Sequence, residues 1–265
     1  MSRIGWLGRN KPFDTTFVVL PIAIFSSVII WFSQNPINPS PAVEASLTNP
    51  VGLLISNFVY DGVINIENVV TSSVFLLVAC LYYPKELRIV VAYLLPIVAI
   101  AAGGLAELTA ISASYTSLRV CGVECSFYGM SGVASAAVGF TTACFFVAFA
   151  MVILRNMGLL TFRDGSNSPK LTSARGRTVL VCSFIAYVLL LLFFSGLLTF
   201  PVAVISHQIS GGGFPGPSPP AVLIQTPPVA FVHSASLLYG FLFCVAAFIY
   251  VNRRYRLLTV GRRMG

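Results

Sequence analysis

The sequence predicts an all-α integral membrane protein, a bundle of six transmembrane helices that forms one domain over residues 1–265. Three observations predict this fold. Hydrophobic residues make up 57% of the chain and charged residues only 9%, whereas a soluble domain carries about 25% charged residues. Six apolar segments occur, most of them long enough to cross a bilayer. The basic residues fall almost entirely into alternate connections between those segments, as they do in membrane proteins.

The six segments follow one another along the whole chain. A spanning helix needs about 20 mostly apolar residues, since each adds about 1.5 Å against roughly 30 Å of hydrocarbon. Lipid leaves no water for backbone polar groups, so spans must be helices or barrel strands, and unbroken apolar runs exclude a barrel. The expected spans are residues 17–32, 69–83, 87–105, 131–154, 178–200 and 229–251, of which the first is short.

The basic residues predict how these spans are oriented. Of the 16 lysines and arginines, only Arg119 falls on the side opposite to the others. Positive residues stay cytoplasmic, so we expect a multi-pass protein of the cell membrane with both termini in the cytoplasm. The same pattern accounts for the net charge of +8, so we expect the lipid bilayer and no nucleic acid as a partner. A signal peptide is the alternative for the first span, because Val43-Glu44-Ala45 follows it.

The long outer connections are expected to lie near the membrane surface. Residues 33–68 contain an apolar stretch, 51–59, that suits the membrane interface. Residues 201–228 are rich in glycine and proline, which is typical of a lid or a disordered loop. Cys121 and Cys125 share a third outer connection, and whether they form a disulfide stays open. The four cysteines inside spans are expected to behave as small hydrophobic residues; these are Cys80, Cys144, Cys182 and Cys244.

Two polar residues at the outer ends of spans can carry chemistry. Ser131 lies in the stretch Gly129–Gly132, at the start of the fourth span, where glycines allow close backbone approach. His233 lies about one turn into the sixth span. Each has a structural alternative, since serine favours close helix packing and a buried histidine can bind a backbone carbonyl. The topology puts both at the outer face and at similar depth, so His233 can act as the base that activates Ser131.

Other residues extend this interpretation. No Asp or Glu lies within the fourth to sixth spans, so a dyad is the only Ser–His arrangement expected within the membrane, and His207 is expected to be a loop residue. Asn68, at the expected head of the second span, is either an oxyanion donor beside the Ser131 N–H or a helix cap. Small residues predict close packing of the fourth and sixth spans; these are Gly132, Ser135, Ala136 and Gly139, with Ser236 and Gly240.

These residues resemble the rhomboid family of intramembrane serine proteases. Residues 128–140, YGMSGVASAAVGF, look like the family's nucleophile segment, and residues 232–240, VHSASLLYG, resemble its histidine pattern. The six-span layout with both ends inside covers nearly the whole chain. The resemblance implies a six-helix rhomboid-like bundle, a Ser131–His233 dyad that water reaches from the outer side, and Asn68 assisting the oxyanion.

The chain departs from the family pattern at several positions. Ile64 stands where the family usually has a histidine four residues before the asparagine, with Asn65 next to it. Ser135 replaces an aromatic residue that often stacks beneath the catalytic histidine, and Ser236 replaces the first glycine after it. The tryptophan–arginine pair of the first outer loop is absent.

The sequence therefore predicts a serine endopeptidase that cleaves transmembrane segments of membrane-protein substrates, with no metal or organic cofactor. One alternative is a catalytically inactive relative that binds transmembrane helices, which the missing histidine at Ile64 favours. A second is a small transporter or channel. Against it, spans one to five hold no charged residue except Glu107, Glu86 and Lys85 near their edges, whereas ion transport leaves charges in mid-membrane.

Overall fold

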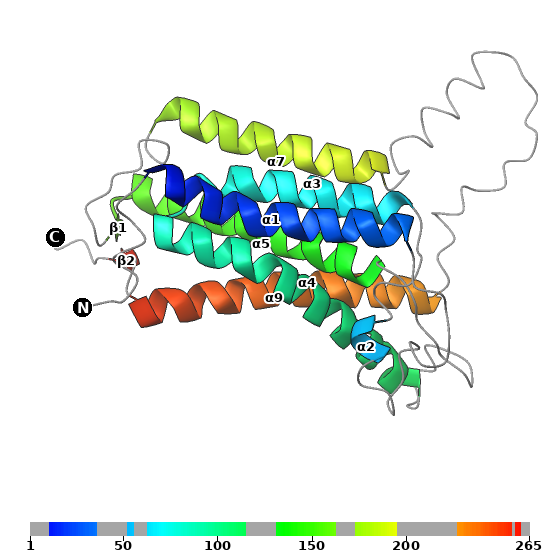
Figure 1. The fold of residues 1–265 in the computed structure, drawn as a ribbon. Helices are drawn as coiled ribbons and strands as arrows, with labels where there is room; N and C mark the ends of the chain where they lie inside the picture. The colour runs from blue at the N-terminus through cyan, green and yellow to red at the C-terminus, as the bar shows by residue number, and fades with distance from the viewer. Residues whose placement is uncertain are drawn as a thin grey trace, which may run out of the picture.

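The computed structural model describes residues 11–35, 52–55, 63–114, 131–162, 173–194, 227–255 and 258–260, and these are mainly helical (Figure 1). Within the described residues, each of the six predicted spans falls on a long helix; residues 195–200 of the fifth predicted span lie outside them. A four-residue helix, α2 (Gly52–Ile55), lies in the apolar stretch of the first outer connection. The long helices are α1 (Lys11–Gln34), α3 (Val63–Cys80), α4 (Lys85–Ser114), α5 (Ser131–Asn156), α7 (Ala174–Phe194) and α9 (Pro227–Tyr255).

The long helices form one bundle in which successive helices run in opposite directions (Figure 1). As a result, α3, α5 and α9 all begin at the same end, which we call the site end. At the other end, two three-residue strands, β1 (Leu160–Phe162) and β2 (Leu258–Val260), pair antiparallel, with Thr161 opposite Thr259. We call this the strand end; every Lys and Arg of the described residues lies in the helical turns at or near it.

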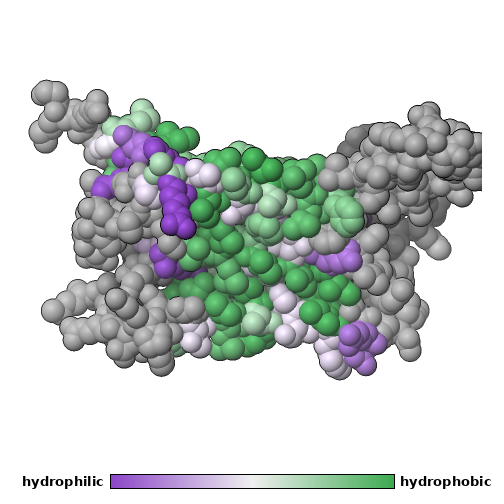
Figure 2. Space-filling view, turned by 90° about the horizontal axis from the view of Figure 1, so that it is seen from above, coloured by the Kyte–Doolittle hydropathy of each residue, from purple (hydrophilic) through white to green (hydrophobic). Residues whose placement is uncertain are grey.

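The outside of the bundle is apolar. Four helices, α4, α5, α7 and α9, are long and apolar enough to cross a membrane, while α1 and α3 contain shorter apolar segments. Figure 2 shows the result as a hydrophobic band across the middle of the molecule, with hydrophilic residues toward its two ends. Large side chains such as Ile97, Ile153 and Ile185 are more than half exposed on this band. Surfaces of this kind are stable only in lipid, so the chain is a multi-pass membrane protein.

Buried side chains from α1, α3, α4, α5, α7 and α9 form a common core, in which Phe140 and Phe145 of α5 are completely buried. Hydroxyl groups link the helices inside this core. Ser26 of α1 donates to Ser73 of α3 at 3.1 Å, and Thr141 of α5 donates to the carbonyl of Ser72 at 3.2 Å. Such bonds fix the relative heights of helices that apolar packing alone leaves free to slide.

At the strand end, hydrogen bonds tie the turn after α3 to α7 and to α4. Tyr82, in the turn after α3, donates to the carbonyl of Gly176 in α7 at 2.6 Å. The Nε of Arg88 donates to the carbonyl of Tyr83 at 2.8 Å. Gly158 follows α5 with a φ of 70°, a left-handed conformation in which glycine commonly ends a helix.

The helix bounds correct both ends of the second expected span and the end of the third. α3 begins at Val63, not at Val69, because a helix leaving the hydrocarbon keeps its own hydrogen bonds and can continue through polar residues. α3 also ends at Cys80, so Tyr82 and Tyr83 belong to the following turn. α4 continues to Ser114, nine residues beyond its expected end. The short β1–β2 pairing was not expected from the sequence.

Candidate active site

Ser131 is the first residue of α5, and its side chain is half-buried at the site end of the bundle. Gly132, Val133 and Ala134 are all buried, which holds the first turn of α5 against the bundle. The first N–H groups of a helix point toward its N-terminal end, where the helix dipole favours negative charge.

His233 is the seventh residue of α9 and is also half-buried at the site end. Its neighbour Val232 packs against Ala106, Ala110 and Ile111 of α4. This contact fixes the first turns of α9 against α4. The Tyr239 hydroxyl, further along α9, lies 3.0 Å from the hydroxyl of Thr109, which adds a polar link between the same two helices.

The helices that carry these two residues touch through their backbones. A Cβ atom added to Gly139 of α5 would collide with the carbonyl oxygen of Leu237, and one added to Gly240 of α9 would collide with the carbonyl oxygen of Ala136. These four residues form what we call the glycine contact. The close packing of the fourth and sixth spans predicted from their small residues is therefore confirmed.

The glycine contact also sets the heights of Ser131 and His233. Ser131 lies five and eight residues before the two α5 residues of the contact, and His233 lies four and seven residues before the two α9 residues. At about 1.5 Å per residue, both lie roughly 6–12 Å from the contact. Because α5 and α9 begin at the same end (Figure 1), both residues lie on the same side of the contact and at closely similar depth.

Asn68 is the sixth residue of α3 and is half-buried. Its position inside the helix excludes the helix-cap alternative. The hydrogen bond from Thr141 to the Ser72 carbonyl marks a common height on α3 and α5. Asn68 lies four residues before Ser72, and Ser131 lies ten residues before Thr141. Asn68 therefore lies deeper than Ser131, by up to about 9 Å along the axes. Asn65, one turn earlier in α3, lies closer to the height of Ser131.

Glu107 of α4 was expected to lie near the edge of a span, but only 2% of its surface is exposed. It follows Ala106, which packs against Val232, so this carboxyl group is buried at the site end near the α4–α9 interface. A buried carboxyl is costly unless it is hydrogen-bonded or neutral. An acidic residue in an apolar helix is the sequence signal that marks such a site.

Ser236 lies one turn after His233 and is completely buried. Its hydroxyl oxygen has no hydrogen-bond partner among the described residues. Ser236 therefore places a buried polar atom on the helix that carries His233. Other residues from the sequence argument, namely His207, Gly129, Met130, Cys121 and Cys125, lie outside the described residues.

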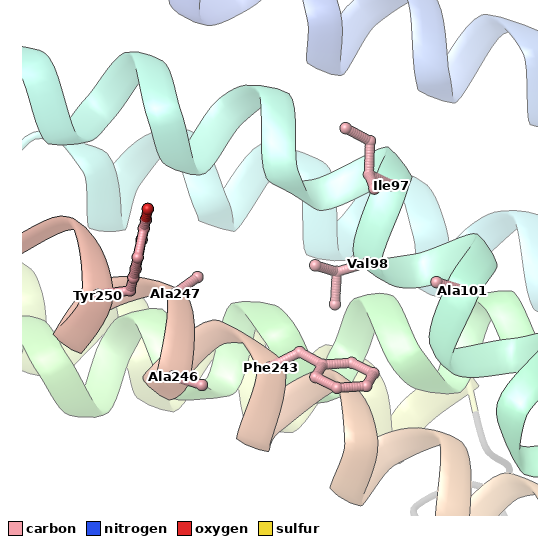
Figure 3. Close-up of a pocket in the computed structure, with 7 residues that line it drawn as sticks. All are labelled: Ile97, Val98, Ala101, Phe243, Ala246, Ala247 and Tyr250. Carbon is pink, nitrogen blue, oxygen red and sulfur yellow. The ribbon is translucent and has the colours of Figure 1, made fainter.

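A groove of about 440 Å³ opens between α4 and α9 (Figure 3). It is almost entirely apolar, and the Tyr250 hydroxyl is the one polar side-chain group that lines it. Its α9 residues follow His233 by ten residues or more, which is at least about 15 Å along the helix. The groove is therefore separate from Ser131 and His233 and offers no group for catalysis. Its lining is Ile97, Val98, Ala101, Phe243, Ala246, Ala247 and Tyr250.

Comparison of this chain with protein-family models, curated proteins and solved structures finds no match in any of the three.

Proposed function

We propose that this protein is an intramembrane serine endopeptidase of the rhomboid type, with Ser131 as nucleophile and His233 as general base. One observation carries the proposal. The two residues occupy the same end and nearly the same depth of two helices whose backbones touch at the glycine contact. A serine hydroxyl becomes an effective nucleophile when a base is held beside it, and backbone contact between the two helices favours that proximity.

In the proposed mechanism, His233 takes the proton of the Ser131 hydroxyl as the oxygen attacks a peptide carbonyl of the substrate. The carbonyl oxygen becomes an oxyanion, which the Ser131 N–H stabilises by donating a hydrogen bond. An asparagine amide of α3 is the second proposed donor, either that of Asn68 or that of Asn65, which lies closer to the height of Ser131. The dipole of α5 supports the same charge because the helix begins at Ser131. His233 then gives its proton to the leaving amine, and water hydrolyses the acyl-enzyme by the same route.

The proposed topology has six spans, with the strand end in the cytoplasm and the site end at the outer face. The described lysines and arginines near the strand end support it, because positive residues stay cytoplasmic. α1 and α3 have apolar segments of only 17 and 15 residues, Thr16–Phe32 and Ile66–Cys80. Both pack against other helices, so they complete the bundle as short spans. Water then reaches Ser131 from outside.

The proposed substrate is a transmembrane segment of another membrane protein, which enters from the side of the bundle. α7 is the helix that supports this route, because only 17% of its apolar window is buried. It packs on α3 and α5 through aromatic contacts, such as Phe184 with Phe145 at a centroid distance of 5.3 Å. Two hydrogen bonds also hold it, from Tyr187 to the Val138 carbonyl and from Tyr82 to the Gly176 carbonyl. A weakly packed helix can move aside at low cost.

Covalent labelling tests this function directly. We expect a serine-reactive fluorophosphonate to label the purified protein in detergent, and the label to vanish in Ser131→Ala and in His233→Ala. Ser135→Ala and Ser234→Ala are matched controls, one on each helix, and should keep the label. Circular dichroism verifies that every variant keeps its helices.

A folded wild-type protein that stays unlabelled would overturn the protease proposal. It would favour the alternative of an inactive relative that binds transmembrane helices. Label that persists in Ser131→Ala would show that another serine reacts, and would remove Ser131 from the proposed role.

A further inference from the structure

Two buried thiols contact each other between the helices that carry Ser131 and His233. The Sγ atoms of Cys144 in α5 and Cys244 in α9 are 3.5 Å apart, although the residues are 100 positions apart in the sequence. Cys144 is completely buried and Cys244 is 3% exposed. Cys80 of α3 is also buried, while Cys182 of α7 is exposed. The contact between two sulfurs distinguishes Cys144 and Cys244 from the other thiols of the described residues.

We propose that Cys144 and Cys244 are a redox-active pair, which an apolar two-electron oxidant converts into a disulfide that joins α5 to α9. This modification site goes beyond the proposed protease activity and does not depend on it. Ser131 and His233 lie on the other side of the glycine contact, so the bond forms without touching either. It would fasten together the two helices on which the proposed dyad depends.

The geometry around the pair favours the bond. A disulfide has a sulfur–sulfur distance of about 2.05 Å, so the two atoms need to approach by about 1.5 Å from their present contact. Rotation of the two side chains can supply much of this approach, because the glycine contact, only four to five residues away along each helix, holds the backbones close. The Tyr83 hydroxyl, which donates to the Cys144 carbonyl at 2.5 Å, also fixes α5 at this level.

The burial of the pair determines which oxidant can reach it. Thiols hidden from water are poorly reactive toward charged reagents. An oxidant dissolved in hydrocarbon, such as molecular iodine or a membrane quinone, can reach the two thiols without crossing water. In the reaction with iodine, two S–H bonds break and one S–S bond forms. The two electrons reduce iodine to two iodide ions, and two protons are released.

To test this, the purified protein in detergent is treated with molecular iodine. The remaining thiols are then blocked under denaturing conditions, and the non-reduced peptides are analysed by mass spectrometry. We expect a linked peptide pair containing Cys144 and Cys244, two hydrogen masses lighter than the sum of its parts. It should form in wild type, Cys80→Ala and Cys182→Ala, and be absent from Cys144→Ala and Cys244→Ala.

Oxidation should also raise the midpoint of thermal unfolding in wild type and leave that of Cys244→Ala unchanged. Folded wild-type protein that gives no Cys144–Cys244 product would overturn the proposal, as would a main product in which Cys80 replaces either partner. Because neither readout measures proteolysis, the result is independent of the fluorophosphonate experiment. The pair can fail while Ser131 labels, and the reverse can also occur.

Discussion

Gly240 of α9 lies directly against the backbone carbonyl of Ala136 in α5, with no space for a side chain between them. Gly139 makes the reciprocal approach to Leu237. Helices in lipid gain little from the hydrophobic effect and associate through close packing instead. The glycine contact is therefore the structural basis for holding α5 and α9 together, and the candidate dyad lies within about two turns of it.

Replacing Gly240 with alanine is expected to destabilise the bundle. The new methyl group would overlap the Ala136 carbonyl, which cannot move without disturbing α5. Overpacking of this kind costs about 1–3 kcal/mol, so the midpoint of thermal unfolding should fall and fluorophosphonate labelling should weaken. Ala246→Val, which adds methyl groups at an exposed position of the same helix, is the control. Equal midpoints for Gly240→Ala and wild type would contradict the importance of this contact.

Much of this arrangement can be predicted from the sequence, and the reasons are physical. Long apolar segments locate the six helices, because the thickness of the hydrocarbon layer determines how long such a segment must be. The small residues at Gly139 and Gly240 predict the close approach of α5 and α9, because only small residues permit it. The helix-cap alternative for Asn68 was wrong, because hydropathy marks the edge of the hydrocarbon, whereas the helix that contains Asn68 continues beyond that edge to Val63.

Tertiary contacts account for the features that the sequence does not reveal. Glu107 looks like a residue at a span edge, and only the packing of Val232 on Ala106 shows that it is enclosed. Cys144 and Cys244 each look like small hydrophobic residues, and their contact depends on the relative rotation of two helices. The sequence pattern of either helix alone does not determine how far that helix is rotated toward the other. The sequence therefore predicts which helices exist better than it predicts which side chains meet.

Asn68 and Asn65 offer a test of the proposed oxyanion site. If Asn68 donates to the oxyanion, Asn68→Ala should lower kcat by about 10²-fold with little change in KM. Its side chain leans toward the start of α3 and so toward the height of Ser131. Asn65→Ala, one turn earlier in α3, is the matched control, and cleavage of a transmembrane substrate is the measurement. A larger loss in Asn65→Ala would transfer the role to that residue.

Tyr83 is expected to stabilise the strand end through its hydroxyl group. It is 2% exposed and donates to the Cys144 carbonyl at 2.5 Å. Tyr83→Phe keeps the ring and removes this bond, at a cost of about 0.5–1.5 kcal/mol, so the midpoint of thermal unfolding should fall. Tyr250→Phe is the control, because Tyr250 is 68% exposed and should show no change. Equal midpoints for the two variants would argue against a stabilising role for the Tyr83 bond.

The buried carboxyl of Glu107 gives the last prediction. Glu107→Ala should lower the midpoint of thermal unfolding, because it leaves a cavity beside Ala106 and removes a buried polar group from its surroundings, at a cost of about 1–3 kcal/mol. Glu107→Gln keeps the volume and part of the hydrogen bonding, so its effect should be smaller. The same two substitutions at Glu67, which is half-buried on α3, are the controls and should be nearly neutral. If Glu107→Ala proved as stable as wild type, the carboxyl would have no structural role. A loss of labelling in Glu107→Gln without a change in stability would instead connect this acid to His233, on the neighbouring helix.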